Sequence, residues 1–243
     1  MRATWLCLLT GLLCSACGYR HYASALRPAE SDVEEISIAD DGTVTFTQER
    51  LEVRLRPMTD EELNRQFAAP SAAGTQAINP YTFSGADLGE AEKGQVRFTV
   101  FRLSVKNYAY PKVRIDPAEI VLRTGNGREY WSLTFGQLDN YYRPYAIGYR
   151  GNEYATYQER RDLLRRTLFG NEPIFSGQEA DGYVVFPSLH ADVRDVEIEV
   201  QDVVLRFDFR NEPVETRDIT YRFTRDVGRE YPDGRVVVDQ PSP

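Results

Sequence analysis

Apolar and polar residues alternate over most of the chain after residue 35, with the period of strands that bury one face. Two tight-turn signals, Asp41-Gly42 and Asn126-Gly127, lie between such alternating segments. These dipeptides accept the positive φ that hairpin turns require. The pattern therefore predicts hairpins over residues 36–46 and 120–135.

Two longer segments change parity along their length. In residues 96–105 the apolar residues stand at even-numbered positions up to Val100 and at odd-numbered positions from Phe101 onward. In residues 196–209 the apolar positions change from even to odd near Gln201. An extra residue in one strand of a pair shifts the side-chain alternation in this way. We therefore expect β-bulges near Phe101 and near Gln201.

The strand pattern continues to the C-terminus. Further strands are predicted over 51–55, 182–186, 219–223 and 235–238, for nine or ten in all. Strands do not alternate with crossover helices, so a parallel α/β fold is disfavoured. The pattern favours a mainly β fold, an antiparallel β-sandwich.

Helical signals are few. Thr59 and Glu62 fit a capping box at the start of a short helix that runs to Phe67, and residues 68–94 are predicted to be a loop. A second helix is predicted from about residue 152 to 169, where Tyr and Leu fall on one face and charged residues on most of the remainder. It is expected to pack on the sandwich as one inserted α-helix, within an insert at about 138–173.

The first residues have the composition of an export signal. A basic start at Arg2 precedes a mostly apolar run over residues 3–13, too short to span a bilayer, and small residues follow it. Residues 1–16 are therefore predicted to be a signal peptide. All three cysteines of the chain lie in its first seventeen residues.

The run Leu13-Cys14-Ser15-Ala16-Cys17-Gly18 resembles the lipobox of bacterial lipoproteins, although Cys14 occupies a position where Leu is usual. The resemblance implies that Cys17 is diacylated and becomes the mature N-terminus. It also implies a lipid-anchored, extracytoplasmic place in the bacterial cell envelope. In a Gram-negative cell, Gly18 implies sorting to the outer membrane. The alternative is a plain signal peptide cleaved near Ala16 without lipidation.

Residues 17–32 lack periodicity and are rich in Ser, Ala, Pro and Glu from Gly18 onward. This composition predicts a flexible N-terminal tether that carries the lipid. The remaining residues, 33–243, are predicted to form a single β-sandwich domain, a length sufficient for a substantial core.

A second resemblance concerns the domain. Its motifs are Leu103-Ser-Val-Lys-Asn107, Asp116-Pro117, Asn126-Gly127 and Gly182-Tyr-Val-Val-Phe186-Pro187. Their order resembles immunoglobulin-like, telokin-like sandwich domains of exported bacterial lipoproteins, many of which have no assigned activity. The resemblance covers about half of the mature chain. It implies an immunoglobulin-like fold and an extracytoplasmic setting, and it transfers no catalytic residue.

Charge and composition exclude several functions. The net charge of −8, with basic residues scattered among acids, disfavours nucleic-acid binding. No phosphate-cradling or dinucleotide motif is present, so no cofactor is expected. His21 and His190 lack the companions of a zinc site, and no metal is expected.

Two further groups of residues have types that occur in catalytic sites. Ser188, His190 and Asp192 have the residue types of a triad, but neighbours on one strand face are too far apart for direct proton transfer. Glu197 and Glu199 alternate with apolar residues and are expected on an exposed face. The sequence therefore favours a protein that is not an enzyme.

Tyrosine is the prominent residue of the insert. Six of the fifteen tyrosines fall within residues 141–157, with two arginines among them. Tyr and Arg are enriched at protein interfaces. The alternatives are that the rings pack the insert onto the sandwich, contact a protein, or stack on sugars. The candidate interaction surface comprises Tyr141, Tyr142, Tyr145, Tyr149, Arg150 and Tyr154.

These observations lead us to expect a non-enzymatic, lipid-anchored envelope protein that serves as an interaction or structural module. Its partners would be the membrane, through the lipid on Cys17, and another envelope protein. One alternative is a module that binds glycan or peptidoglycan through the Tyr-rich insert. A second alternative is a hydrolase that uses a carboxylate pair.

Overall fold

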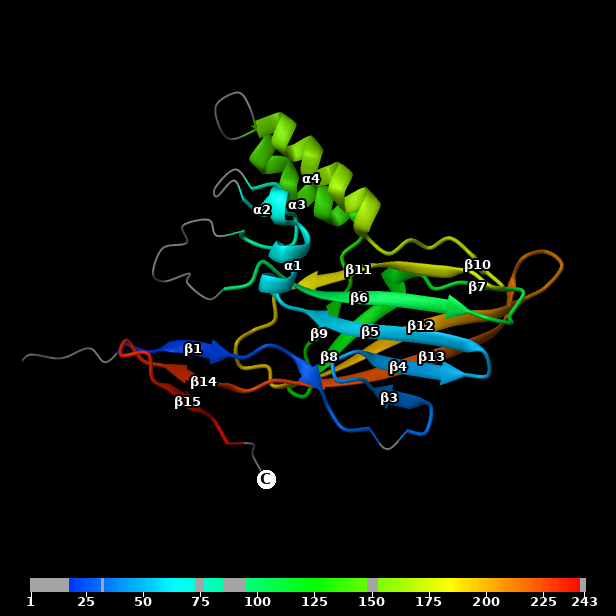
Figure 1. Ribbon diagram of the computed structural model, residues 1–243, viewed down its shortest axis with the longest axis horizontal. Coiled ribbons are helices and arrows are strands. Elements are labelled where there is room, and N and C mark those ends of the chain that lie inside the picture. The colour runs from blue at the N-terminus through cyan, green and yellow to red at the C-terminus, as the bar shows by residue number, and fades with distance from the viewer. Residues whose placement is uncertain (1–17, 32, 73–76, 85–94, 148–152, 241–243) are drawn as a thin grey trace, which may run out of the picture.

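The computed structural model describes residues 18–31, 33–72, 77–84, 95–147 and 153–240. Two five-stranded sheets pack face to face to form a β-sandwich (Figure 1). Every strand pair in the described residues is antiparallel, as the sequence predicted. The fold is mainly β, and its immunoglobulin-like subtype stays a prediction.

The first sheet has the order β11-β6-β5-β4-β3. Its strands are β3 (Ile36–Ile38), β4 (Val44–Gln48), β5 (Leu51–Met58), β6 (Phe98–Asn107) and β11 (Glu179–Pro187). The predicted hairpin turn between β3 and β4 is confirmed, with Gly42 at a φ of 82°.

The second sheet has the order β2-β13-β12-β8-β9. Its strands are β2 (Arg27–Pro28), β8 (Ile120–Thr124), β9 (Glu129–Trp131), β12 (Asp195–Phe207) and β13 (Pro213–Thr224). Gly127 closes the predicted β8–β9 hairpin at a φ of 82°, and the register of β12 against β13 shifts between Val200 and Val203. The bulge predicted near Gln201 is thus confirmed.

Two small sheets and a 3-10 turn complete the β-structure. The strands β1 (Arg20–Ala23), β14 (Val227–Glu230) and β15 (Val236–Val238) form a three-stranded sheet in the order β1-β14-β15. The strands β7 (Lys112–Val113) and β10 (Ile174–Phe175) pair with each other, and a 3-10 turn spans Pro117–Glu119.

The flexible tether predicted for residues 17–32 is wrong for residues 20–23 and 27–28, which are paired strands. Arg20 pairs in register with Glu230, and Arg27 forms an ion pair with Asp226. The predicted boundary at residue 33 is therefore also wrong, because the folded part includes residues from Arg20 onward. Local composition suggested a linker since these short strands bury little apolar surface and their partners lie some 200 residues away.

The bulge predicted near Phe101 is also wrong, because β6 pairs in unbroken register with both β5 and β11. Apolar residues occur at both even and odd positions of β6 because both faces of this strand are covered. Phe101 and Leu103 face the core between the sheets, whereas Phe98 and Val100 face a second core on the outer side.

Three helices contribute to this second core over the outer face of β6 and β11 (Figure 1). They are α1 (Asp60–Gln66), α3 (Phe135–Ile147) and α4 (Glu153–Thr167). A short helix, α2 (Ala68–Ser71), follows α1 and has no buried residue. The capping box of Thr59 and Glu62 is present at the start of α1, as predicted. The insert holds two helices that pack against each other instead of the one predicted.

Candidate functional site

The Tyr-rich insert was the predicted interaction surface, and part of it is buried. Tyr142 on α3 is buried, and its hydroxyl donates a hydrogen bond of 2.5 Å to the carbonyl of Pro80. The guanidinium of Arg97 donates to the same hydroxyl at 2.8 Å, and that of Arg160 lies 5.3 Å from the ring centroid. The prediction that Tyr142 belongs to an interaction surface is therefore wrong, because its ring and hydroxyl fix α3 to the rest of the molecule.

Tyr157 on α4 is buried as well and joins the two helices of the insert. Its hydroxyl donates to Asp139 on α3 at 2.7 Å, and this bond raises the pKa of Tyr157. Arg161 forms an ion pair with the same carboxylate at 2.8 Å. One carboxylate of α3 thus accepts from two side chains of α4 and holds the helical hairpin closed.

Two tyrosines of the predicted surface remain accessible. Tyr154 on α4 is 64% exposed, and Tyr141 on α3 is 39% exposed with its ring edge-on to Phe98 at 5.0 Å. Tyr149, Arg150 and the side chain of Tyr145 lie outside the described residues. Among the described tyrosines of the insert, Tyr141 and Tyr154 therefore carry the accessible ring area.

A hollow of about 780 Å³ lies where β1, the β5–α1 junction, the start of β6 and the loop after β11 meet. Both histidines of the chain line it, His21 from β1 and His190 from the loop after β11. Its apolar lining includes Leu26, Met58 and Phe98. Sequence analysis did not bring these residues together, because it assigned His21 to a tether and not to a strand.

Asp60, the first residue of α1, supplies the single carboxylate among the described residues that line this cavity. Burial raises the pKa of Asp60 from 3.8 to about 6, although the positive charge of Arg97 opposes the rise. A raised pKa is one mark of functional carboxyl groups. The position of Asp60 in the first turn of a capped helix was visible in the sequence, but its burial was not.

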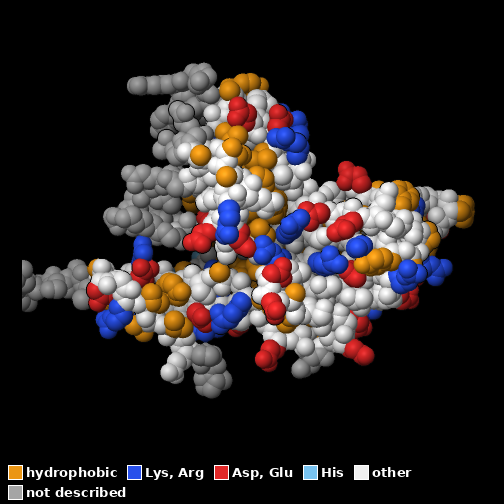
Figure 2. Space-filling model, viewed as in Figure 1, with side chains coloured by type: hydrophobic (Ala, Val, Ile, Leu, Met, Phe, Trp, Pro, Cys, Tyr) orange, Lys and Arg blue, Asp and Glu red, His pale blue; other side chains and the backbone are white. Residues whose placement is uncertain are grey.

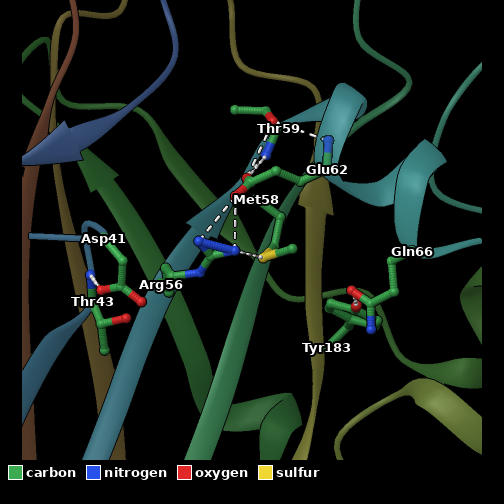
Figure 3. Close-up of polar contacts among 8 residues, drawn as sticks. All are labelled: Asp41, Thr43, Arg56, Met58, Thr59, Glu62, Gln66 and Tyr183. Atoms are coloured by element: carbon green, nitrogen blue, oxygen red, sulfur yellow. Dashed lines mark hydrogen bonds and ion pairs between the residues drawn. The ribbon is translucent and has the colours of Figure 1, made fainter.

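The junction that positions Asp60 is held by a small polar network (Figure 3). The hydroxyl of Thr59 accepts from the backbone N–H of Glu62 at 3.2 Å, and the backbone N–H of Thr59 donates to the Glu62 carboxylate at 3.0 Å. Arg56 on β5 donates two hydrogen bonds, of 2.9 and 2.8 Å, to the same carboxylate. Glu62 therefore serves both the helix cap and an ion pair to the sheet.

Two of the three residues of the triad types at 188–192 are held by arginines. Asp192 forms an ion pair of 2.7 Å with Arg128, and that contact lowers the pKa of Asp192. The carbonyl of His190 accepts a bond of 2.6 Å from buried Arg225, which also donates to the carbonyl of Val193 at 2.7 Å. Arg225 therefore shapes the loop after β11, and Asp192 serves an ion pair.

The carboxylate pair of β12 is engaged in ion pairs across the sheet. Glu197 pairs with Arg222 at 3.1 Å, and Glu199 pairs with Arg123. The hydrogen bond from Arg123 lowers the pKa of Glu199. A glycosidase requires one carboxyl with a raised pKa as its acid. The pKa shift of Glu199 is opposite to that requirement.

The described residues include no group of three or more His, Cys, Asp or Glu side chains that could hold a metal ion. Within the same residues, no helix combines the length and apolar character needed to cross a bilayer.

Comparisons with known proteins identify no family. No family model matches the chain, and no curated protein matches it. A solved structure, described as that of a functionally unknown protein from Listeria monocytogenes EGD-e, is 13% identical. The match covers 86% of this chain and 89% of that one, with a TM-score of 0.32.

Proposed function

We propose that the protein is a non-enzymatic module of the bacterial cell envelope, anchored to a membrane by acyl chains on Cys17. The sandwich is an immunoglobulin-like domain that lies outside the cytoplasm, and it holds the helical hairpin α3–α4 where another envelope protein can contact it. In a Gram-negative cell the anchor lies in the outer membrane.

The run from Leu13 to Gly18 carries this proposal, because small residues precede a cysteine at the end of an apolar segment. The distribution of cysteines adds support. Cys7, Cys14 and Cys17 are the three cysteines of the chain, so a chain processed before Cys17 retains one thiol at its very start. Lipid attachment gives that isolated thiol a role that a disulfide cannot.

Labelling with palmitate tests the anchor. Cells that make the wild type, Cys17→Ser or Cys7→Ala receive labelled palmitate, and the immunoprecipitated protein is measured. We expect label in the wild type and in Cys7→Ala, and none in Cys17→Ser. Cys7→Ala is the matched control because it removes a thiol of the same segment outside the run from Leu13 to Gly18. Equal labelling of all three proteins, or of none, contradicts the proposal.

The accessible rings of α3 and α4 support the interaction role. Tyr154 and Tyr141 expose large amphipathic side chains on helices that project from the sandwich (Figures 1 and 2). Tyrosine is favoured at interfaces because it offers large contact area at low rotamer entropy. A row of accessible ring faces, which the glycan-binding alternative needs, has less support because Tyr142 and Tyr157 are buried.

Photocrosslinking in living cells tests the partner. A photoreactive amino acid is placed at Tyr154 in one protein and at Trp131, an exposed aromatic residue of β9, in another. We expect a discrete crosslinked product from position 154 that position 131 does not give. Identical products from both positions, or no product from position 154, contradict a partner on this helix.

A further inference from the structure

We propose that the three-stranded sheet β1-β14-β15 rests directly on the phospholipid surface, with Tyr19 and Tyr231 at the level of the headgroups. The inference rests on the lipid anchor proposed above and adds a second point of membrane contact, built from the fold itself. The occupant of this surface is the bilayer that holds the acyl chains of Cys17.

The length of chain available to the anchor supports this placement. Only Gly18 and Tyr19 separate Cys17 from Arg20, the first residue of β1. Three residue steps span at most about 10 Å when fully extended. Acyl chains on Cys17 therefore hold Arg20 within that distance of the membrane, and because β1 is hydrogen-bonded to β14, they bring the edge of the three-stranded sheet to the membrane with it.

The sheet gathers aromatic and cationic side chains on one side. His21 lies opposite Arg229 in the register of β1 and β14. Tyr19 and Tyr231 are two residues away from His21 and Arg229, so their side chains are expected on the same face of the sheet. The ring of Tyr19 lies 5.9 Å from that of His21 and 6.4 Å from that of Tyr231. The ion pair between Arg20 and Glu230 lies on the opposite face of the sheet.

The chemistry of this face suits the boundary between water and lipid. The guanidinium of Arg229 lies 5.1 Å from the ring centroid of Tyr19, and that of Arg235 lies 4.6 Å from the ring centroid of Tyr231. Tyr19 is 49% exposed, and the side chains of β15 are exposed valines. Tyrosine rings prefer the headgroup level of membranes, and arginine pairs with phosphate. Figure 2 shows apolar side chains beside basic and acidic ones over this part of the molecule.

The opposite end of the long axis provides an internal control. The turn between β12 and β13 lies there, far from β1 and β14 (Figure 1). Phe209 in that turn is 91% exposed. An aromatic probe at this position samples water if the three-stranded sheet faces the membrane.

Quenching by brominated lipid tests the placement. Tyr231→Trp and Phe209→Trp are each made in a Trp131→Phe background, so that each processed chain contains one tryptophan. Each processed and lipidated protein is purified in detergent and reconstituted into vesicles of phosphatidylethanolamine and phosphatidylglycerol, with or without bromine on the acyl chains. Circular dichroism checks the fold, and Tyr19→Trp serves as a second probe if Tyr231→Trp is misfolded.

We expect emission from position 231 to fall about twofold in brominated vesicles, because interfacial rings sit near the acyl boundary, and emission from position 209 to stay unchanged. Equal emission in plain and brominated vesicles at position 231 overturns the proposal, as does quenching at position 209.

A chemically anchored chain separates failure of this inference from failure of the anchor. A chain that begins at Cys17 has that residue as its one thiol, so a maleimide phospholipid couples there alone. If the natural protein carries no lipid, the coupled chain still tests the sheet, with the same expected and contradicting outcomes. If the natural protein is lipidated but position 231 is not quenched, the anchor stands and the sheet contact is wrong.

Discussion

The hydroxyl of Tyr221, on β13 of one sheet, donates a hydrogen bond of 2.8 Å to the backbone carbonyl of Val53, on β5 of the other sheet. Tyr221 is fully buried, so water cannot replace this bond. The bond gives the buried hydroxyl of Tyr221 a hydrogen-bond partner, and it links the two sheets of the sandwich.

Tyr221→Phe is expected to lower the free energy of unfolding by about 1 to 2 kcal/mol, because the carbonyl of Val53 loses a donor in a dry environment. Urea denaturation followed by circular dichroism measures the change. Tyr154→Phe, which alters an exposed ring, is the control and is expected to have no measurable effect. A neutral Tyr221→Phe substitution would show that the bond adds nothing to stability.

Stability is expected to fall in alkali. Burial raises the pKa values of Tyr221, Tyr81 and Tyr183. In the unfolded chain these phenols release their protons near pH 10. The stability that depends on their neutral forms is therefore fully present below about pH 10 and is lost as the pH rises further. Urea midpoints measured between pH 8 and pH 11 should decline less steeply for Tyr221→Phe than for the wild type; parallel curves would contradict this linkage.

Asp60→Asn is expected to stabilise the protein at neutral pH. The folded carboxyl has a pKa of about 6, above its value of 3.8 in the unfolded chain. The wild type therefore has the full benefit of a neutral Asp60 below about pH 4 and loses it as the pH rises through 6. The variant should be more stable by about 1 to 2 kcal/mol above pH 7 and equal to the wild type near pH 4.

Urea denaturation across this pH range gives the difference between Asp60→Asn and the wild type at each pH. Glu61→Gln is the matched control, since it changes the exposed neighbouring carboxyl of the same helix. A constant difference at all pH values would mean that the burial of Asp60 does not set its pKa.

Gly182→Ala is expected to be strongly destabilising. A Cβ at position 182 would lie 2.5 Å from the backbone N and Cα of Phe169, where the chain leaving α4 crosses β11. The N–H of Phe169 also donates to the carbonyl of Tyr183 at 2.9 Å, so the two segments cannot separate without losing that bond. Glycine in a strand often marks such a close approach of two backbones.

We expect Gly182→Ala to lower the unfolding free energy by about 2 to 4 kcal/mol, the range of severe backbone clashes. Gly136→Ala, at an exposed position of α3 where a Cβ would lie 4.0 Å from the hydroxyl of Thr134, should be neutral or slightly stabilising. Thermal unfolding of both variants measures the contrast. Equal midpoints would show that the crossing relaxes freely.

Local signals predicted the elements whose geometry depends on near neighbours. The turns at Gly42 and Gly127, the cap at Thr59 and the bulge near Gln201 all follow from short-range chemistry, and the structure has each of them. The helix α3 was missed, although Thr134 and Gln137 form a capping box at its start with bonds of 2.8 and 3.3 Å. Its tyrosines and Pro144 weakened the helical signal.

Features that depend on distant partners could not be predicted. The strand β1 exists because β14, about 200 residues away, offers an edge to pair with, and nothing local to residues 20–23 shows this. The parity change at Phe101 has the same origin, since the helices that cover the outer face of β6 come from elsewhere in the chain. The burial of Tyr142 and the raised pKa of Asp60 likewise arise from tertiary packing.

Mass spectrometry of the N-terminal tryptic peptide tests the central claim most directly. Trypsin cleaves after Arg20, so a processed and lipidated protein yields the peptide Cys17-Gly18-Tyr19-Arg20. The account predicts this peptide with a diacylglyceryl group on the sulfur of Cys17 in protein taken from membranes. An unmodified Cys17 peptide, or a peptide that still continues into Ala16, would contradict it.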